Sequence, residues 1–276
     1  MRSVWTGAAC IGAALLLSGV PLCAQLRDNS EKQLTCANSG NDGDRARHCE
    51  IREQSLPSVG SLNVDAGPNG GVTVKGWLRA DVLVRARIEA AADTEGAAAN
   101  LASRVTVDGS GGRVRATGPA SENRSWWSVG YEIFVPQATD VTVKTHNGGV
   151  TVSDVRGRLH VEGINGGVHL TRVAGEITGR TVNGGINVEL AGSGFDGRQM
   201  ELATTNGGVT VTMPPDYSAS VHAETGMGRV QSDFPLPPNL ANARSQRMEF
   251  AIGSGGPPIH IATTNGSIRL KRAQAQ

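Results

Sequence analysis

The sequence Asn-Gly-Gly, followed by valine or isoleucine, returns along this chain at a nearly constant spacing. Copies begin at Asn147, Asn165 and Asn183, 18 residues apart, and a fourth follows 23 residues later at Asn206. Self-similarity at a fixed period marks a fold built of equal structural units. The predicted corners of these units, including weaker copies near both ends, are Asn69, Gly70, Gly71, Asn147, Gly148, Gly149, Asn165, Gly166, Gly167, Asn183, Gly184, Gly185, Asn206, Gly207, Gly208, Asn265 and Gly266.

Between the corners, apolar and polar residues alternate, which is the pattern of a half-buried strand. At the 18-residue offset, Val141, Leu159 and Ile177 share one apolar column. Two architectures fit this pattern. In a meander each Asn-Gly would be a hairpin turn, whereas in a solenoid each unit would be one coil stacked on the next. The column-wise match favours an all-β, parallel, right-handed β-solenoid of short coils with Asn-Gly-Gly corners.

A solenoid assigns a role to each corner residue. The stacked asparagines would form a ladder of amide hydrogen bonds between coils. The glycines would supply positive φ angles without steric strain at Cβ. We expect the solenoid to span residues 56–272, with a short helix or a loop at 91–102 and a polar tail at 273–276. The last coil, which ends at Lys271 and Arg272, would cap the stack.

The first residues have the features of a secretory signal peptide. Arg2 precedes an apolar run that ends in small residues at Ala24, which predicts a signal peptide over residues 1–24. The run is too short to span a membrane as a helix, and no second run follows, so we expect no transmembrane span. A lipoprotein anchored through Cys23 is disfavoured because Leu22 stands where a small residue is wanted.

Residues 25–55 form a polar segment that contains the two remaining cysteines. A pair of cysteines in an exported chain predicts a disulfide, here between Cys36 and Cys49. A metal site that uses His48 with both cysteines is the alternative, although it lacks a fourth ligand. The formal net charge is +1 and the chain has no run of basic residues, which argues against a nucleic-acid partner.

These features together resemble a family of exported bacterial β-strand-repeat proteins that carry a putative-adhesin domain of unknown function. The matching features are the signal peptide, the early corner at Asn69–Val72, and Val135-Pro136 at the entry to the repeats. They continue with the central Asn-Gly-Gly coils, the break at Met213–Pro215 and the closing Thr264–Ile268. The resemblance covers about residues 56–272. It implies a parallel β-solenoid at the cell envelope. It does not imply a reaction, and the adhesin label of this family itself rests on fold analogy.

Candidates for chemistry are few. Lys144, Glu162 and Arg180, followed by Ala203, share an outward column that could be an acid–base cluster on a sugar or a charge ladder that fixes the register. The alternation of sign favours the ladder. We expect the histidines at 160, 169, 222 and 260 to be scattered on the surface, and we predict neither a metal nor a cofactor.

Trp126 and Trp127 stand next to each other in a predicted strand, so one should face inward and the other solvent. An exposed tryptophan beside Tyr131, with Arg124 stacked on its ring, could contact a sugar. The alternative is an aromatic lid over the open end of the solenoid, which the pattern favours.

The sequence therefore predicts a non-enzymatic, exported element of the envelope, in the periplasm, at the surface or secreted. Its partner would be a cell-wall polymer or an envelope protein. A carbohydrate-active β-helix enzyme, either a lyase or a hydrolase, is the main alternative. An accessory or sensor domain of an envelope stress system is a third.

Overall fold

The computed structural model describes residues 29–37, 44–122, 124–192, 194, 197–237 and 246–274. The signal peptide predicted over residues 1–24, including Cys23, lies outside these residues, as do residues 275–276 of the predicted tail. Within the described residues, no helix is both long and apolar enough to cross a membrane.

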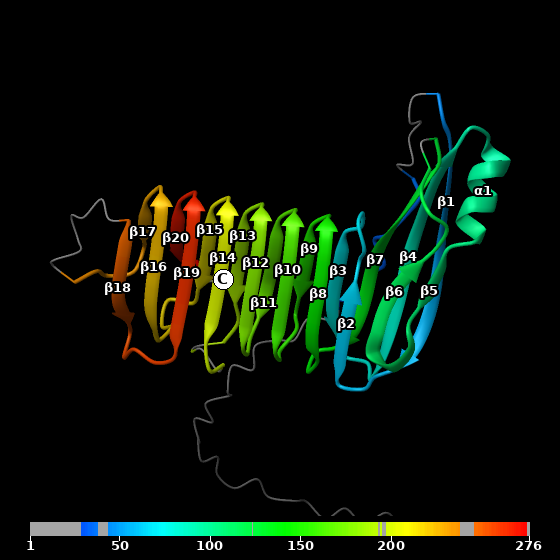
Figure 1. Ribbon diagram of the computed structural model, residues 1–276. Coiled ribbons are helices and arrows are strands. Elements are labelled where there is room, and N and C mark those ends of the chain that lie inside the picture. Colours follow the sequence, from blue (N-terminus) through cyan, green and yellow to red (C-terminus); the bar gives the residue numbers. More distant parts are fainter. Residues whose placement is uncertain are drawn as a thin grey trace, which may run out of the picture.

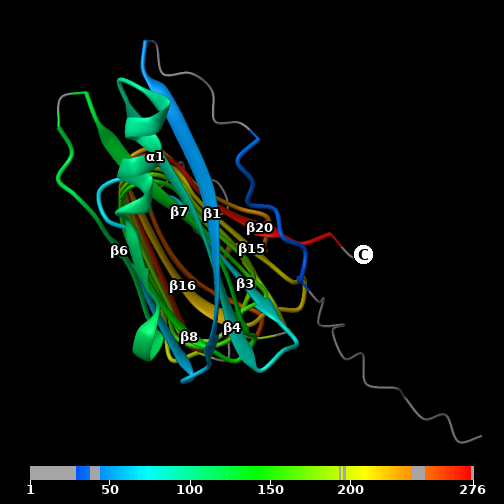
Figure 2. The ribbon, with the colours of Figure 1, turned by 90° about the vertical axis from the view of Figure 1, so that its right-hand side faces the viewer.

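Nearly all regular structure belongs to two ten-stranded sheets that face each other along an elongated body (Figures 1 and 2). Sheet 1 contains, in spatial order, β1 (Ala46–Pro57), β4 (Asp81–Ala92), β7 (Trp126–Pro136), β3 (Val72–Trp77), β9 (Val150–Ser153), β11 (Val168–Val173), β13 (Ile186–Leu190), β15 (Val209–Met213), β20 (Ile268–Arg272) and β17 (Val230–Ser232). Sheet 2 contains β18 (Arg247–Ile252), β16 (Ala219–Met227), β19 (Pro258–Asn265), β14 (Met200–Asn206), β12 (Ile177–Asn183), β10 (Leu159–Asn165), β8 (Asp140–Asn147), β2 (Ser61–Asp65), β6 (Arg113–Thr117) and β5 (Thr106–Asp108).

The prediction of an all-β chain is confirmed. The segment at 91–102 is partly helical, since α1 spans Glu95–Ser103, and a short 3-10 turn spans Ser110–Gly112. The side chain of Thr94 caps α1 by accepting the N–H of Ala97.

The central strands stack in parallel with the register of the sequence repeat. In sheet 2, Leu159 lies opposite Val141 on one side and Ile177 on the other. Each chain passage through an Asn-Gly-Gly corner moves from sheet 2 to sheet 1, as from β8 to β9. The right-handed sense of the coil stays a prediction.

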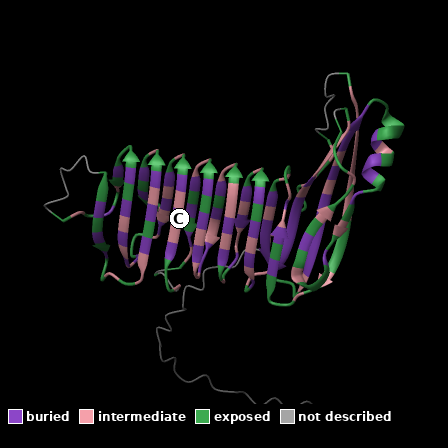
Figure 3. Ribbon diagram, in the orientation of Figure 1, coloured by how far each residue is buried: buried purple, intermediate pink, exposed green. Residues whose placement is uncertain are grey.

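The core lies between the sheets and follows the alternation of each strand. Figure 3 shows buried and less buried residues in turn along the central strands. The apolar columns are almost completely buried, with Val143 and Val161 both 0% exposed. Branched aliphatic side chains fill the narrow space between the sheets, so few aromatic residues are needed.

The corner asparagines form a continuous ladder. Each side-chain Nδ2 donates to Oδ1 of the preceding coil, from Asn165 to Asn147 and from Asn183 to Asn165 at 2.8 Å in both cases. The ladder starts at Asn69 and continues through Asn206 to Asn265.

We expect Asn165→Ala to lower the free energy of unfolding by about 1–2 kcal/mol, because it removes two exposed amide hydrogen bonds. Urea unfolding would measure this change. Thr205→Ala, at an exposed position beside the ladder, is the matched control and should change stability by less than about 0.5 kcal/mol. Equal losses for the two variants would show that the ladder is not what stabilises the corner.

The predicted role of the corner glycines is wrong. All of them lie within the described residues, and none has a positive φ. The first glycine of each corner is instead required by close stacking, since a Cβ on Gly166 would lie 2.2 Å from the carbonyl oxygen of Gly148. Positive φ angles occur at the other corner of the coil, at Asp154 (56°), Arg172 (51°) and Gly175 (100°).

The last coil in the sequence is not the cap that we predicted. Strand β19 lies between β14 and β16, and β20 lies between β15 and β17. Along the chain, the terminal coil (β16 and β17) and the antiparallel edge strand β18 therefore precede β19 and β20, which lie between that coil and β14 and β15. Met227 takes the asparagine position opposite Asn265, so the amide ladder stops where the stack ends.

The other end of the body departs from a parallel solenoid. Strands β1, β4 and β7 pair in an antiparallel manner, and α1 packs Ala98, Leu101 and Ala102 into this end. The domain boundary predicted between residues 55 and 56 falls inside β1, which forms twelve pairs with β4. Residues 46–55 of the N-terminal polar segment are therefore part of sheet 1.

Residues 29–37 form a strap across the outer face of sheet 1. Glu132, 2% exposed, accepts the backbone N–H of Gln33 at 2.9 Å and that of Leu34 at 3.1 Å. Lys75 donates to the same carboxylate at 2.9 Å, and Arg85 also pairs with it. Both cations are themselves less than a tenth exposed. The strap therefore closes over a buried ion cluster.

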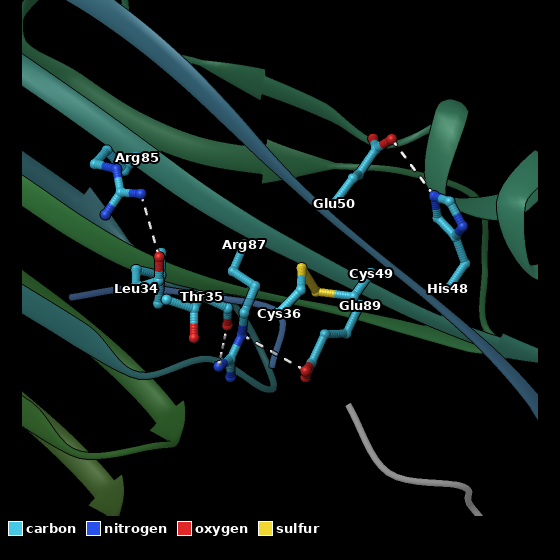
Figure 4. Close-up of a disulfide and its surroundings, with 9 residues drawn as sticks. All are labelled: Leu34, Thr35, Cys36, His48, Cys49, Glu50, Arg85, Arg87 and Glu89. Atoms are coloured by element: carbon cyan, nitrogen blue, oxygen red, sulfur yellow. Dashed lines mark hydrogen bonds and ion pairs between the residues drawn. A yellow bond between two sulfur atoms is a disulfide. The ribbon is translucent and has the colours of Figure 1, made fainter. Parts of the chain in front are cut away.

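The strap is also tied covalently to β1. Cys36 and Cys49 are joined in a disulfide, and Figure 4 shows this bond beside Arg87, which donates to the Thr35 carbonyl at 3.3 Å. Since the two sulfur atoms bind each other, the alternative metal site is wrong. His48 instead faces Glu50 at 3.6 Å.

Candidate functional site

The predicted outward column is a charge ladder over the middle of sheet 2. Glu162 lies opposite Lys144 on one side and Arg180 on the other, with Ala203 next. Lys144 Nζ is 2.9 Å from Glu162, whereas Arg180 turns to Glu201 at 2.6 Å. These pairs are well exposed, so each contributes about 0–1 kcal/mol.

The electrostatics of Glu162 do not suit a general acid. The hydrogen bond from Lys144, assisted by His160, holds the pKa of the Glu162 carboxyl below its usual value against the opposing effect of burial. A glycosidase acid needs the opposite shift, so that it carries a proton near neutral pH. This part of sheet 2 is therefore a laddered surface.

A second outward column brings together residues that the sequence analysis treated as scattered. Glu201, His260, His222 and Glu249 lie in register on the neighbouring strands β14, β19, β16 and β18. The imidazole rings of His222 and His260 stack, with centroids 4.8 Å apart and planes inclined by 20°.

The insertion of β19 creates this histidine pair. His260 stands five residues before Asn265, and His222 stands five before Met227, whose place at the asparagine position only the structure shows. The sequence alone did not place these two coils side by side. His160 and His169 remain apart from the pair, the first 2.9 Å from Glu162 and the second 3.4 Å from Asn187.

The histidine pair lines the first of two adjoining hollows on the outer face of sheet 2. The first has a volume of about 270 Å³ and is lined by His222, His260, Glu224, Arg247 and Glu249, among others. The second, of about 580 Å³, runs over Ala203 and Ala262 toward Thr205 and Thr264. Both include Glu224 and Ala262 in their lining. Ala203 and Ala262 have short side chains, so the outer surface of sheet 2 is lower at these two positions, which produces the depression.

Ion pairs border the hollows. Arg247 binds Glu224 at 2.7 Å, and Arg180 binds Glu201 at 2.6 Å on the opposite side. Glu249, which is 72% exposed in its side chain, lies 3.5 Å from Nδ1 of His222. The site therefore offers paired charges, two imidazoles and threonine hydroxyl groups above a floor of methyl groups.

Among the described residues, no group of three or more His, Cys, Asp or Glu side chains is arranged to hold a metal ion.

The aromatic sugar contact, which the sequence pattern had favoured less than a lid, is contradicted at Tyr131 and Trp127. Tyr131 is 2% exposed, and burial raises the pKa of its hydroxyl, so it cannot contact a ligand. Trp127 packs against the core and donates to the Pro119 carbonyl at 2.7 Å. Trp126 is half-buried on the other face of β7, where the guanidinium over its ring, at 5.3 Å, is that of Arg47.

Arg124, which we expected to stack on a tryptophan, pairs with Asp44 and Asp93 instead. The packing of Trp127 fits the alternative of an aromatic lid at this end of the core.

Comparisons with known proteins give one family and several solved structures. The family described as Toastrack DUF4097 matches residues 80–271. No curated protein matches the chain. A putative cell adhesion protein from Clostridium sporogenes is 13% identical, with a TM-score of 0.48 over 82% of this chain and 100% of that one. A putative adhesin from Bacteroides fragilis is 10% identical, with a TM-score of 0.39 over 82% and 97%. A putative adhesin from Parabacteroides merdae is 11% identical, with a TM-score of 0.28 over 80% and 95%.

Proposed function

We propose that this chain, which belongs to the Toastrack DUF4097 family, is a non-enzymatic binding element of the cell envelope. Its partner would be a cell-wall polymer, held on the outer face of sheet 2. The observation that carries the proposal is the pair of adjoining hollows over Ala203 and Ala262, where stacking of the coils places charged groups, imidazoles and hydroxyl groups from several strands.

Two features support a location outside the cytoplasm. The signal peptide expected over residues 1–24 would export the chain. The Cys36–Cys49 disulfide is typical of an oxidising compartment. The stacked architecture also suits an extended ligand, since a solenoid presents a long and regular face.

The alternative of a carbohydrate-active enzyme has one observation in its favour, because carboxylates and histidines do meet at the hollows. Both carboxylates beside the alanine floor are nevertheless held by arginines, Glu201 by Arg180 and Glu224 by Arg247. Carboxylates that are already bound by guanidinium groups favour a binding role over proton donation. The sensor alternative stays a prediction.

The test is binding of the purified protein to cell-wall fractions and to a glycan array. We expect Ala262→Trp, which fills the floor of the hollows, to weaken binding at least tenfold. Thr210→Trp, on the outer face of sheet 1, should leave it unchanged and serves as the control. If Ala262→Trp left binding unchanged, the binding site would lie elsewhere on the protein. An absence of binding by the wild type would refute the proposal. Release of new sugar ends from a bound polymer would favour the enzyme.

A further inference from the structure

The stacked histidines place two titratable groups in the lining of the first hollow, which adjoins the second. His222 and His260 come from the adjacent parallel strands β16 and β19, with ring centroids 4.8 Å apart. Histidine is the side chain whose charge ordinarily changes between pH 5 and 8. Two imidazolium rings at this separation repel each other, and negative charge supplied nearby offsets that repulsion.

The protein supplies that negative charge incompletely. Glu249, on β18, lies 3.5 Å from His222 but is 72% exposed in its side chain. Glu201, on β14, is in register with His260 but is bound by Arg180 of β12. Glu224, on the same strand as His222, is bound by Arg247 of β18. The remaining charge for a doubly protonated pair must therefore come from outside the chain.

The charge of the site changes sign when both histidines are protonated. Around the pair, three carboxylates (Glu201, Glu224 and Glu249) face two guanidinium groups (Arg180 and Arg247). The site thus carries one net negative charge with neutral histidines and one net positive charge with both protonated. An anion is disfavoured in the first state and attracted in the second.

The shape of the site indicates an extended ligand. From β12 to β18 the hollows cross five neighbouring strands, which is about 19 Å at the usual spacing of strands. The floor consists of the alanine methyl groups, and Thr205 and Thr264 lie along one side. Methyl groups and hydroxyl groups of this kind suit the face and the edge of a sugar ring.

We propose that the His222–His260 pair makes the hollows a proton-dependent binding site for an acidic polysaccharide that bears carboxylates. This inference rests on the proposed function, whose polymer it defines more narrowly. Binding of the carboxylates draws protons onto the pair, so by linkage a lower pH strengthens binding. The pair is a binding element and takes no part in a reaction.

The experiment measures binding of polygalacturonate to the full protein by calorimetry at pH 5.5 and pH 7.5, at one ionic strength, with neutral dextran as the control polymer. The sugar carboxylates are ionised at both pH values. We expect the complex to be at least tenfold tighter at pH 5.5, with no binding of dextran. Equal affinities at the two pH values, or binding of dextran as tight as that of polygalacturonate, would overturn the inference.

Variants separate charge from a merely structural role. His222→Gln combined with His260→Gln should abolish the pH dependence. His222→Gln combined with His260→Arg, which puts a permanent charge in place of the titratable pair, should bind with affinities that agree within twofold at the two pH values. His169→Gln, on the outer face of sheet 1, should behave as the wild type. Thermal unfolding would verify that each variant is folded. If the double variant kept the pH dependence, the histidine pair would not be its source.

Failure of the inference can be told apart from failure of the proposed function. If the wild type binds cell-wall fractions and Ala262→Trp weakens this binding, the proposed function stands, even when polygalacturonate shows no pH dependence. If the wild type binds neither the fractions nor polygalacturonate at either pH, both are wrong.

Discussion

Replacement of Gly148 by alanine is expected to lower the free energy of unfolding by about 3 kcal/mol or more. A Cβ at this position would lie 2.2 Å from the carbonyl oxygen of Gly70 and 2.5 Å from its carbonyl carbon, both of which belong to the backbone of the preceding coil. A flexible side chain could turn away from such a contact, but a backbone held by the stack cannot. Overpacking of a well-ordered interior costs about 1–3 kcal/mol, and more where the backbone must move.

The neighbouring glycine is the matched control. A Cβ at Gly149 would meet nothing closer than the Gly167 carbonyl oxygen at 3.5 Å, which is an ordinary contact. Gly149→Ala should therefore change stability by less than about 1 kcal/mol. Urea unfolding of the two variants would measure the difference. Similar losses at the two positions would mean that the corner does not depend on close approach of its first glycine.

Glu132→Gln is expected to cost about 3–5 kcal/mol of stability at neutral pH. The substitution keeps the size of the side chain but leaves the cations of Lys75 and Arg85 buried without their shared carboxylate. Removal of one partner from a buried ion pair leaves an uncompensated charge, which is the costly outcome. Glu162→Gln, at the exposed pair with Lys144, is the control and should cost less than about 1 kcal/mol.

The loss of stability in Glu132→Gln should also depend on pH. Burial opposes the ionisation of Glu132, but the N–H groups of Gln33 and Leu34 and the cations of Lys75 and Arg85 outweigh it, so the pKa lies below its usual value. A lowered pKa contributes stability that is complete above the unfolded value of about 4.3 and is lost as the pH falls through the folded value.

The stability difference between wild type and Glu132→Gln should therefore be constant from pH 8 to pH 6 and should shrink below about pH 4.3. Unfolding in urea at a series of pH values would measure it. A difference that grew on acidification would contradict the role assigned to the carboxylate.

The central coils were predictable because they depend on local and repeated information. The 18-residue period aligned Val141, Leu159 and Ile177 before any contact was known, and the structure pairs these residues. Parallel stacking at equal offsets brings like residues together, so a column in the sequence becomes a column in space. The asparagine ladder follows from the same property.

The reason for the glycines was not predictable from the repeat. Both positive φ and close approach favour glycine, and composition alone does not separate them. In the structure, close approach of the backbone requires glycine at position 148. Positive φ angles occur at the opposite corner of the coil, where Asp154 adopts one although it is not glycine.

The candidate site depends on the order in which coils are stacked, which is not the order in which they are synthesised. His222 and His260 are 38 residues apart and meet only because β19 enters between β14 and β16. The amides explain this order in retrospect, because Asn265 can continue the ladder from Asn206 whereas Met227 can only end it.

By itself, the sequence determined the all-β class, the length of the coil and the residues that face its core, because alternation and period are properties of the chain. The tertiary structure decided the place of the last coil, the buried ion cluster beneath the strap and the histidine pair in the hollows. Each of these depends on contacts between segments that share no period. Such contacts form only when backbone pairing, burial and charge are satisfied together in the folded chain.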